Sequence, residues 1–267
     1  SEMVPDNWTT EDLGKFLIPL SKSRYPSNIS DKNGYYNFYV CSLNVQRSFK
    51  CDITEPAVLF STGGEAAIHY ATGKYSYSTD VWATKYSKNL TNEFVFRFIE
   101  LNISRINNLG FQGSGIKHLD KDYIKKIKIT YPPLPEQKKI ASILTSVDEV
   151  IEKTQLQINK LQDLKKGTMN ELLTKGIGHT EFKDSELGRI PNSWEVKSLG
   201  DVAVLIMGQS PSSDTYNNKK NGTPFFQGKA DFGIKHPKVR YWCTSPTKIA
   251  PIDSILFSVR APVGDVN

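Results

Sequence analysis

Cysteine and histidine are scarce in this chain of 267 residues. The three cysteines are an odd number and contain no C-x-x-C pair, so no disulfide framework is expected. The four histidines show no spacing that is typical of metal ligands. The sequence therefore predicts neither a structural metal site nor a bound cofactor.

Long hydrophobic runs are also missing. No stretch reaches the roughly 18 apolar residues that a membrane span needs, and the N-terminus lacks the basic-then-apolar order of a signal peptide. We therefore expect a soluble, cytoplasmic protein that has no membrane partner. Its 38% hydrophobic content is enough to bury a real core.

Positive charge is in excess, with a formal net charge of +6. This balance favours a polyanionic partner such as nucleic acid. Lysine and arginine stand close to tyrosine at residues 22–25 and 74–77, in segments suited to contacts with phosphates and base edges. A solvated, tyrosine-rich surface explains any single one of these clusters equally well.

Two parts of the chain repeat each other, which indicates two copies of one structural unit. Residues 4–14 align with residues 190–200, and Pro, Trp, Leu and Gly match in place. Residues 56–61 are echoed by residues 253–258 at a larger offset, which implies a longer loop in the second copy. The second copy stops within ten residues of this echo. We therefore expect a partial second domain.

The remaining patterns favour an α+β fold. Apolar residues alternate or run together between Gly, Asn and Ser turns, which predicts strands at residues 35–40, 57–60, 75–82 and 127–129. Helices are predicted at residues 93–105 and 120–126. The predicted domains are a recognition domain at 1–134, a long helix at 135–175, a linker at 176–189 and a partial second domain at 190–267.

The long helix is the clearest single element. Its apolar residues recur in steps of four and three, as in a coiled coil, and it ends before Gly176. Its length of roughly 57 Å leaves an apolar seam that needs a partner helix. The seam consists of Ile140, Leu144, Val147, Ile151, Ile158, Leu161 and Leu172.

Two fragments look like motifs of an adenine methyltransferase. Residues 111–115 fit F-x-G-x-G, and residues 131–134 are close to the catalytic D/N-P-P-Y/F. A cofactor turn should follow a buried strand and open a helix, but the preceding residues are polar and rich in Asn. Tyr131 also replaces the Asp or Asn that would accept a hydrogen bond from adenine. We therefore expect no catalytic residues, and a stiff proline hinge at 132–135.

Residues at both ends of the helix resemble the specificity subunit of type I restriction-modification systems. Gly113-Ser114-Gly115-Ile116 and Pro132-Pro133-Leu134-x-Glu136-Gln137 resemble its join between recognition domain and helix, and residues 172–194 resemble its entry to the second domain. The resemblance implies a non-catalytic reader of double-stranded DNA. In that family, each recognition domain reads half of a split site. Two antiparallel helices set the spacing and dock methyltransferase subunits and, through them, restriction subunits.

This chain departs from that pattern, because most of the second domain and the whole second helix are lacking. We therefore expect its seam to pair with the same helix of a second copy. Recognition residues cannot be transferred within the family, so side-chain chemistry indicates the candidates. They are Lys22, Arg24, Tyr35, Tyr36, Lys74, Tyr75, Gln112, Ser114, Lys117 and His118. The competing hypotheses are an assembly scaffold, an inactive short subunit and a free-standing adenine methyltransferase.

Overall fold

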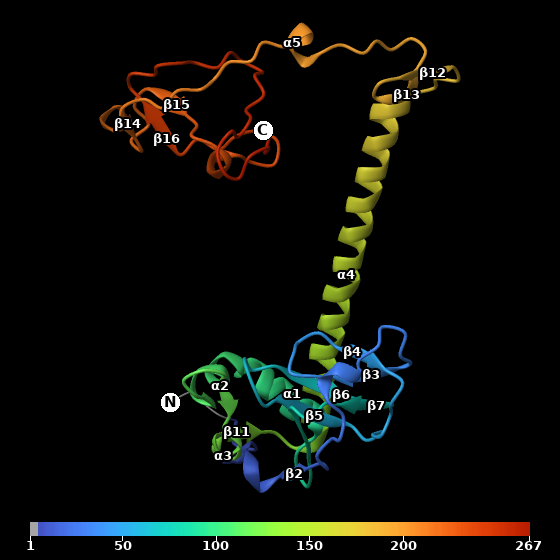
Figure 1. The fold of residues 1–267 in the computed structure, drawn as a ribbon. Coiled ribbons are helices and arrows are strands. Elements are labelled where there is room, and N and C mark those ends of the chain that lie inside the picture. Colours follow the sequence, from blue (N-terminus) through green and yellow to red (C-terminus); the bar gives the residue numbers. More distant parts are fainter. Residues whose placement is uncertain (1–4) are drawn as a thin grey trace. The chain divides into compact units, whose positions relative to one another are not determined.

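The computed structural model describes residues 5–267 (Figure 1). Val4, the first residue of the predicted repeat, lies outside the described residues. The chain divides into two compact units between Lys166 and Gly167, inside the long helix α4 (Leu134–Lys175). Sheets and helices occur together, so the predicted α+β fold is confirmed. The predicted domain boundaries stay predictions.

A four-stranded antiparallel sheet forms the centre of the first unit. Its order is β2 (Leu17–Pro19), β8 (Val81–Tyr86), β5 (Ala57–Ser61) and β6 (Ile68–Ala71). All five residues of β5 are buried, since both faces of the sheet are covered. This explains why β5 is a continuous apolar run rather than an alternating one.

The side chains of β5 alternate between two cores. Val58 and Phe60 pack with the helices α1 (Asn92–Leu101) and α2 (Ile103–Leu109). Ala57 and Leu59 pack on the other face against a second sheet. That sheet has the order β4 (Gln46–Ser48), β3 (Tyr36–Tyr39), β7 (Tyr75–Tyr77), and its β3–β7 pair is parallel.

Two predicted elements are each divided in the structure. The predicted strand 75–82 is β7 and β8, which belong to different sheets. The predicted helix 93–105 is α1 and α2, separated at Asn102, whose side chain donates to the Phe98 carbonyl at 2.8 Å. A side chain that competes for backbone groups in this way favours a helix end.

Local signals account for the ends of the remaining elements of this unit. Asp120 caps α3 (Lys121–Lys126) by accepting hydrogen bonds from the backbone N–H groups of Asp122 and Tyr123. The chain then enters β11 (Lys128–Tyr131), which pairs antiparallel with β1 (Thr9–Asp12). The two ends of the segment 9–131 thereby lie side by side, and α4 follows β11 after the prolines.

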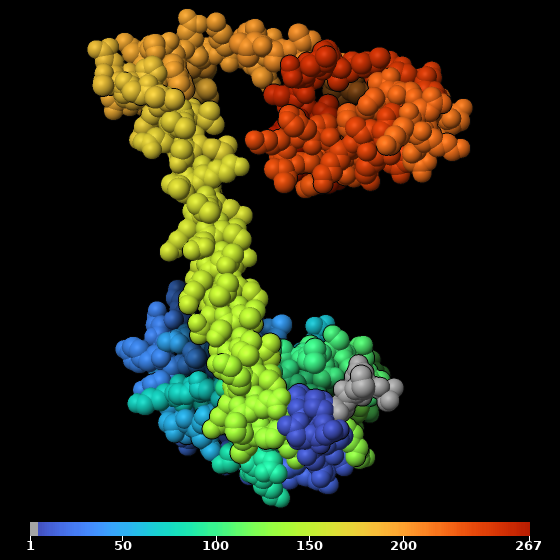
Figure 2. All heavy atoms as spheres, turned by 180° about the vertical axis from the view of Figure 1, so that it is seen from behind, coloured from blue at the N-terminus to red at the C-terminus, as the bar shows by residue number. Residues whose placement is uncertain are grey.

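Helix α4 is continuous over 42 residues and ends where the sequence predicts. Gly176 follows it with φ 68°, a left-handed conformation that glycine adopts at low cost, and its N–H bonds to the Leu172 carbonyl at 3.1 Å. From residue 146 onward every residue of the helix is exposed, and Figure 2 shows their side chains on the surface in the face viewed. No helix in the described part of the chain combines the length and hydropathy that a membrane crossing needs.

The second unit contains a hairpin of β12 (Phe182–Ser185) and β13 (Gly188–Pro191) and a short helix α5 (Leu199–Val202). A three-stranded sheet follows with the order β14 (Tyr216–Asn217), β16 (Tyr241–Cys243), β15 (Thr223–Phe225). Few side chains are buried here, and most large apolar residues of this unit are exposed.

The predicted repeat has a counterpart in backbone hydrogen bonds. The Trp8 N–H donates to the Pro5 carbonyl at 3.0 Å, and the Trp194 N–H donates to the Pro191 carbonyl at 2.9 Å. The two copies differ in packing, since Leu13 is fully buried whereas the aligned Leu199 is 63% exposed. The second copy therefore reproduces the local turn without the core that surrounds it in the first.

Candidate nucleic-acid interface

A serine closes the loop that follows β5. The Ser61 hydroxyl donates to the Glu65 carbonyl at 2.8 Å and accepts from the Ala67 N–H at 2.9 Å. The Asn107 side chain of α2 accepts from the Ala66 N–H at 2.8 Å, which ties the loop to the helical layer. Residues 62–65 are thus held in a closed loop and are partly or fully exposed. Ser61 and Asn107 were not among the predicted residues.

The glycine-rich segment 113–117 forms the turn of a β-hairpin. It joins β9 (Phe111–Gln112) to β10 (His118–Leu119), which pair antiparallel. Phe111 and Leu119 are buried and anchor the hairpin, whereas residues 112–118 are exposed. Gly113 has φ 140°, and a Cβ there would lie 3.0 Å from the Ile116 carbonyl oxygen. The F-x-G-x-G residues therefore connect two strands and do not form a strand-to-helix cofactor turn.

Tyr131, the first residue of the catalytic-like tetrapeptide, is in the core. It is 6% exposed, and its ring meets that of Phe16 edge-on with centroids 5.6 Å apart. On β11 it pairs with Thr9. Tyr131 thus has a packing role, although it also lines a groove of about 410 Å³ together with residues 132–135.

The loop and the hairpin lie against each other. The Gly64 N–H donates to the Lys117 carbonyl at 2.9 Å, and the Leu119 N–H donates to the Thr62 carbonyl at 3.1 Å. Gly63 and His118 form an antiparallel bridge. The structure therefore brings four predicted residues next to residues 62–64: Gln112, Ser114, Lys117 and His118.

A groove of about 370 Å³ lies on another side of Thr62. Lys22, Trp82 and Lys121 are among its lining residues. The Lys121 ammonium lies 5.3 Å from the centre of the Trp82 ring, a distance typical of a cation–π contact. The name Thr62 surface is used below for Lys22, Lys121 and residues 62–64 and 112–118.

The lysines of the Thr62 surface lack acidic partners. Within residues 5–267, Lys22, Lys117 and Lys121 form no ion pair, whereas nearby Lys125 pairs with Asp122 at 2.8 Å. Lys121 also stands in the first turn of α3, where the helix dipole disfavours a cation. These uncompensated charges are suited to an anionic ligand.

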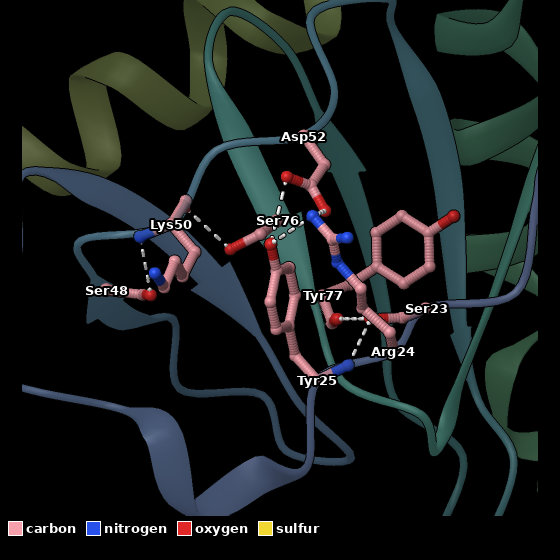
Figure 3. A network of polar contacts seen from close by, with 8 residues as sticks. All are labelled: Ser23, Arg24, Tyr25, Ser48, Lys50, Asp52, Ser76 and Tyr77. Carbon is pink, nitrogen blue, oxygen red and sulfur yellow. Dashed lines mark hydrogen bonds and ion pairs between the residues drawn. The ribbon is translucent and has the colours of Figure 1, made fainter.

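Arg24, in contrast, is engaged by its own domain (Figure 3). Its guanidinium donates to the Tyr25 hydroxyl at 3.2 Å and lies 3.5 Å from Asp52, to which Tyr25 also donates at 3.0 Å. The contacts with Tyr25 and then with Asp52 raise the pKa of Arg24 above its ordinary value. Its side chain is 77% exposed, so it stays accessible although its charge is partly compensated.

Three further candidates stand at the N-terminal ends of the parallel pair β3–β7. The register pairs Asn37 with Tyr75, so the preceding residues Tyr36 and Lys74 are neighbours. Tyr35 is 74% exposed, and its carbonyl accepts from Arg47 at 2.8 Å. Whether any of these candidates contacts DNA stays a prediction.

The prediction for Tyr75 is wrong. Tyr75 is fully buried in the core between the two sheets, and its hydroxyl donates to the Glu55 carbonyl at 2.8 Å. Burial also raises its pKa above the ordinary tyrosine value. The side chain cannot reach a ligand on the surface, because strand alternation turns Lys74 outward and Tyr75 inward.

Six of the seven seam residues of α4 are exposed in this chain, from 41% for Leu144 to 63% for Leu161. Ile140 differs, since it is half-buried and packs partly against the core of its own unit. Whether Ile140 also pairs with a partner helix stays a prediction. The rest of the seam, from Leu144 to Leu172, is an uncovered apolar stripe.

A family model described as "Type I restriction modification DNA specificity domain" matches residues 5–163. The chain belongs to this family. The match includes the first recognition domain with the whole Thr62 surface, as well as most of α4. The resemblance inferred from the helix-flanking motifs is thereby confirmed.

Relatives with known names agree with this assignment. This chain is 47% identical over 152 residues to the putative type I restriction enzyme MjaX specificity subunit of Methanocaldococcus jannaschii, covering 56% of this chain and 36% of the relative. It is 34% identical over 220 residues to the MjaVIII specificity subunit of the same organism, covering 77% and 51%. The chain thus spans about a third to a half of the length of these relatives.

Solved structures show the same fold. The S subunit of a type I system from M. genitalium superposes with a TM-score of 0.58 at 14% identity, covering 93% of this chain and 65% of that one. A chain from a study of assembly and conformational transition of the type I system gives a TM-score of 0.53 at 26% identity, covering 100% and 73%.

Proposed function

We propose that this chain reads double-stranded DNA as a specificity subunit of a type I restriction-modification complex, without catalysis of its own. The observation that carries the proposal is the Thr62 surface, where a serine-closed loop, a glycine hairpin and three uncompensated lysines meet. Lysine ammonium groups bind phosphate oxygens. Gln112 and Ser114 supply the donors and acceptors that read base edges in a groove.

We further propose that α4 assembles the complex. The stripe from Leu144 to Leu172 is too long and apolar for a helix exposed to water on all sides, which favours a partner helix. A second copy related by a two-fold axis offers an identical stripe in antiparallel direction. Methyltransferase subunits then dock on the paired helices, and restriction subunits bind through the methyltransferase subunits.

The proposal is tested by titrating a DNA duplex that carries the target site with the full chain and its methyltransferase subunits over a range of salt concentrations. Affinity should fall steeply as salt rises, because bound lysines release counterions. Replacing Lys22, Lys117 and Lys121 together by Ala should weaken binding and reduce the salt slope by roughly one for each lost phosphate contact. Binding that does not respond to salt would contradict the proposal.

A matched control is the replacement of Lys32, Lys88 and Arg105 by Ala. These cations are equally exposed in the same unit and lie outside the Thr62 surface. Equal weakening by both triple variants would mean that only net charge matters and that this surface is not the reader.

An assembly scaffold is the second candidate, favoured by the exposed stripe of α4. It predicts that the Lys22, Lys117 and Lys121 variant still forms the complete complex and binds DNA with unchanged affinity. Mapping methylated adenines in cells that carry the complex separates the two, since only a reader changes which sites are methylated.

A further inference from the structure

The hydrogen bonds that close the loop after β5 recur in the second unit. The Ser258 hydroxyl donates to the Pro262 carbonyl at 2.9 Å and accepts from the Asp265 N–H at 3.0 Å. The Ser61 hydroxyl likewise donates to the carbonyl four residues further along, at 2.8 Å, and accepts from a later N–H at 2.9 Å. The backbone agrees, since the Ser258 N–H donates to the Asp265 carbonyl as the Ser61 N–H does to Ala67, both at 2.9 Å.

The two serines occupy equivalent places in the repeat. Each follows a Leu-Phe pair, and their exposures are 3% for Ser61 and 5% for Ser258. A second equivalence comes from glycines that approach the paired strand too closely for a side chain. A Cβ on Gly34 would lie 2.3 Å from the Ser48 nitrogen, and one on Gly222 would lie 2.2 Å from the Cys243 oxygen. Residues 259–264 are therefore the structural counterpart of residues 62–66.

The two loops differ in where their positive charge comes from. Residues 62–66 contain two glycines and no cation, and lysines from neighbouring elements surround them. Residues 259–264 carry their own cation, Arg260, which is exposed. The acid at the end of this loop, Asp265, is paired with Lys229 at 3.1 Å, and within the described chain Arg260 has no acidic partner.

We propose that residues 259–264 form a second DNA-contacting loop, with Arg260 as its principal contact. This inference rests on the proposed function, because it assigns to the second unit the counterpart of a loop that reads DNA in the first. The Arg260 guanidinium can bind either of two kinds of group on a DNA duplex. It can bind a phosphate, or it can bind O6 and N7 of guanine in the bidentate geometry that a lysine does not reproduce.

The test compares Arg260→Ala with wild type in the full chain together with its methyltransferase subunits, using duplexes that carry the target site. Affinity should fall about 10- to 100-fold, the effect of losing one good arginine contact. The matched control is Lys219→Ala, an exposed cation of the same unit in the turn between β14 and β15, and it should leave affinity unchanged. Arg260→Ala binding as tightly as wild type would overturn the inference.

Arg260→Lys distinguishes the two targets. A phosphate contact should keep most of the affinity with lysine, and the set of methylated sites should not change. A guanine contact should lose affinity and relax the preference at one base pair of the site. The Lys22, Lys117 and Lys121 variant is measured alongside. If that variant binds weakly while Arg260→Ala binds normally, the inference fails and the proposed function stands; if neither variant weakens binding, the proposed function fails as well.

Discussion

The side-chain oxygen of Gln137 accepts a hydrogen bond from the Thr91 backbone N–H at 3.0 Å, joining the first turn of α4 to the start of α1. The Gln137 amide nitrogen donates to the carbonyls of Asn89 at 2.6 Å and Pro132 at 2.8 Å. Gln137 is fully buried. The direction in which α4 leaves the recognition domain is therefore fixed by hydrogen bonds as well as by the proline hinge.

Gln137→Ala should destabilise the first unit by about 2 kcal/mol, because three backbone groups lose their partner and one of them, the Pro132 carbonyl, is buried. The measurement is denaturant unfolding followed by tryptophan fluorescence. The control is Gln157→Ala on the exposed part of the same helix, which should change stability by less than about 0.5 kcal/mol. Similar losses in both variants would show that Gln137 does not lock the helix.

A second clamp lies further along α4, where Arg97 of α1 reaches Asp148 at 2.5 Å and Thr145 at 3.1 Å. The Arg97 side chain is 12% exposed, so its charge is less screened than in a surface pair. A double-mutant cycle of Arg97→Ala and Asp148→Ala should give a coupling energy of about 1 kcal/mol. The exposed pair Lys153–Glu149 should give roughly 0.3 kcal/mol in the same experiment, and equal values would contradict the clamp.

The ends of α4 could be predicted from sequence because local chemistry fixes them. Proline before the first turn and glycine after the last act within a few residues, and the heptad steps depend on no other part of the chain. The same holds for the serine turns of the repeat. The equivalence of the two turns is visible in a short sequence match, and the hydrogen bonds around Ser61 and Ser258 reproduce it.

The roles of Tyr75 and Lys121 could not be predicted in this way. The alternation around Tyr75 indicates a strand but not which face is covered, and here the second sheet buries it. The change of sheet at residues 78–80 has no Gly or Pro to mark it. Lys121 joins Lys22 in one groove because β2, which leads to Lys22, pairs with β8, and the Trp82 ring of β8 lies against Lys121. The local feature that could have indicated a role for Lys121 is its position in the first turn of a predicted helix.

Ser61→Ala should loosen the loop that it closes. The variant leaves the Glu65 carbonyl and the Ala67 N–H without their side-chain partner, at a cost of about 1 to 2 kcal/mol. Hydrogen exchange of residues 62–67 should become faster, and DNA affinity should fall although Ser61 itself is buried. The control is Ser87→Ala, at the residue after β8, because the Ser87 side chain makes no hydrogen bond within residues 5–267. Unchanged exchange at residues 62–67 would rule out the positioning role.

We expect the folded protein to lose stability in mild acid because of His69. Burial lowers the pKa of its imidazole, and the opposing hydrogen bond to the Ser42 carbonyl at 2.7 Å does not reverse this. The unfolded chain binds the proton at a higher pH than the folded one, so stability is fully present above about pH 6.5 and is lost as pH falls below it.

The denaturation midpoint of wild type should therefore drop between pH 7.5 and pH 5.5. His69→Gln keeps an amide donor for the Ser42 carbonyl and removes the titrating group, so its drop should be smaller. The midpoint of His118→Gln, a variant at an exposed position of the same unit, should drop as much as that of wild type. An identical drop in all three proteins would remove His69 as the cause.

The exposed apolar stripe of α4 predicts that two copies of the chain associate. Ile151 and Leu161 are about 60% exposed in the single chain and lie on the heptad seam, where a paired helix would bury them. Replacing both by Glu should shift the chain from dimer to monomer, with the dissociation constant raised at least about 100-fold, because four carboxylates would enter an apolar interface. Light scattering over a range of concentrations gives the mass.

Asn159→Glu with Asn170→Glu adds the same charge to exposed positions off the seam and should leave the mass unchanged. Glutamate favours helix about as well as the residues that it replaces, so both double variants should keep the helical signal in circular dichroism. A wild-type chain that stays monomeric at every concentration would contradict pairing between copies. The stripe would then have to be covered by a helix from a different subunit.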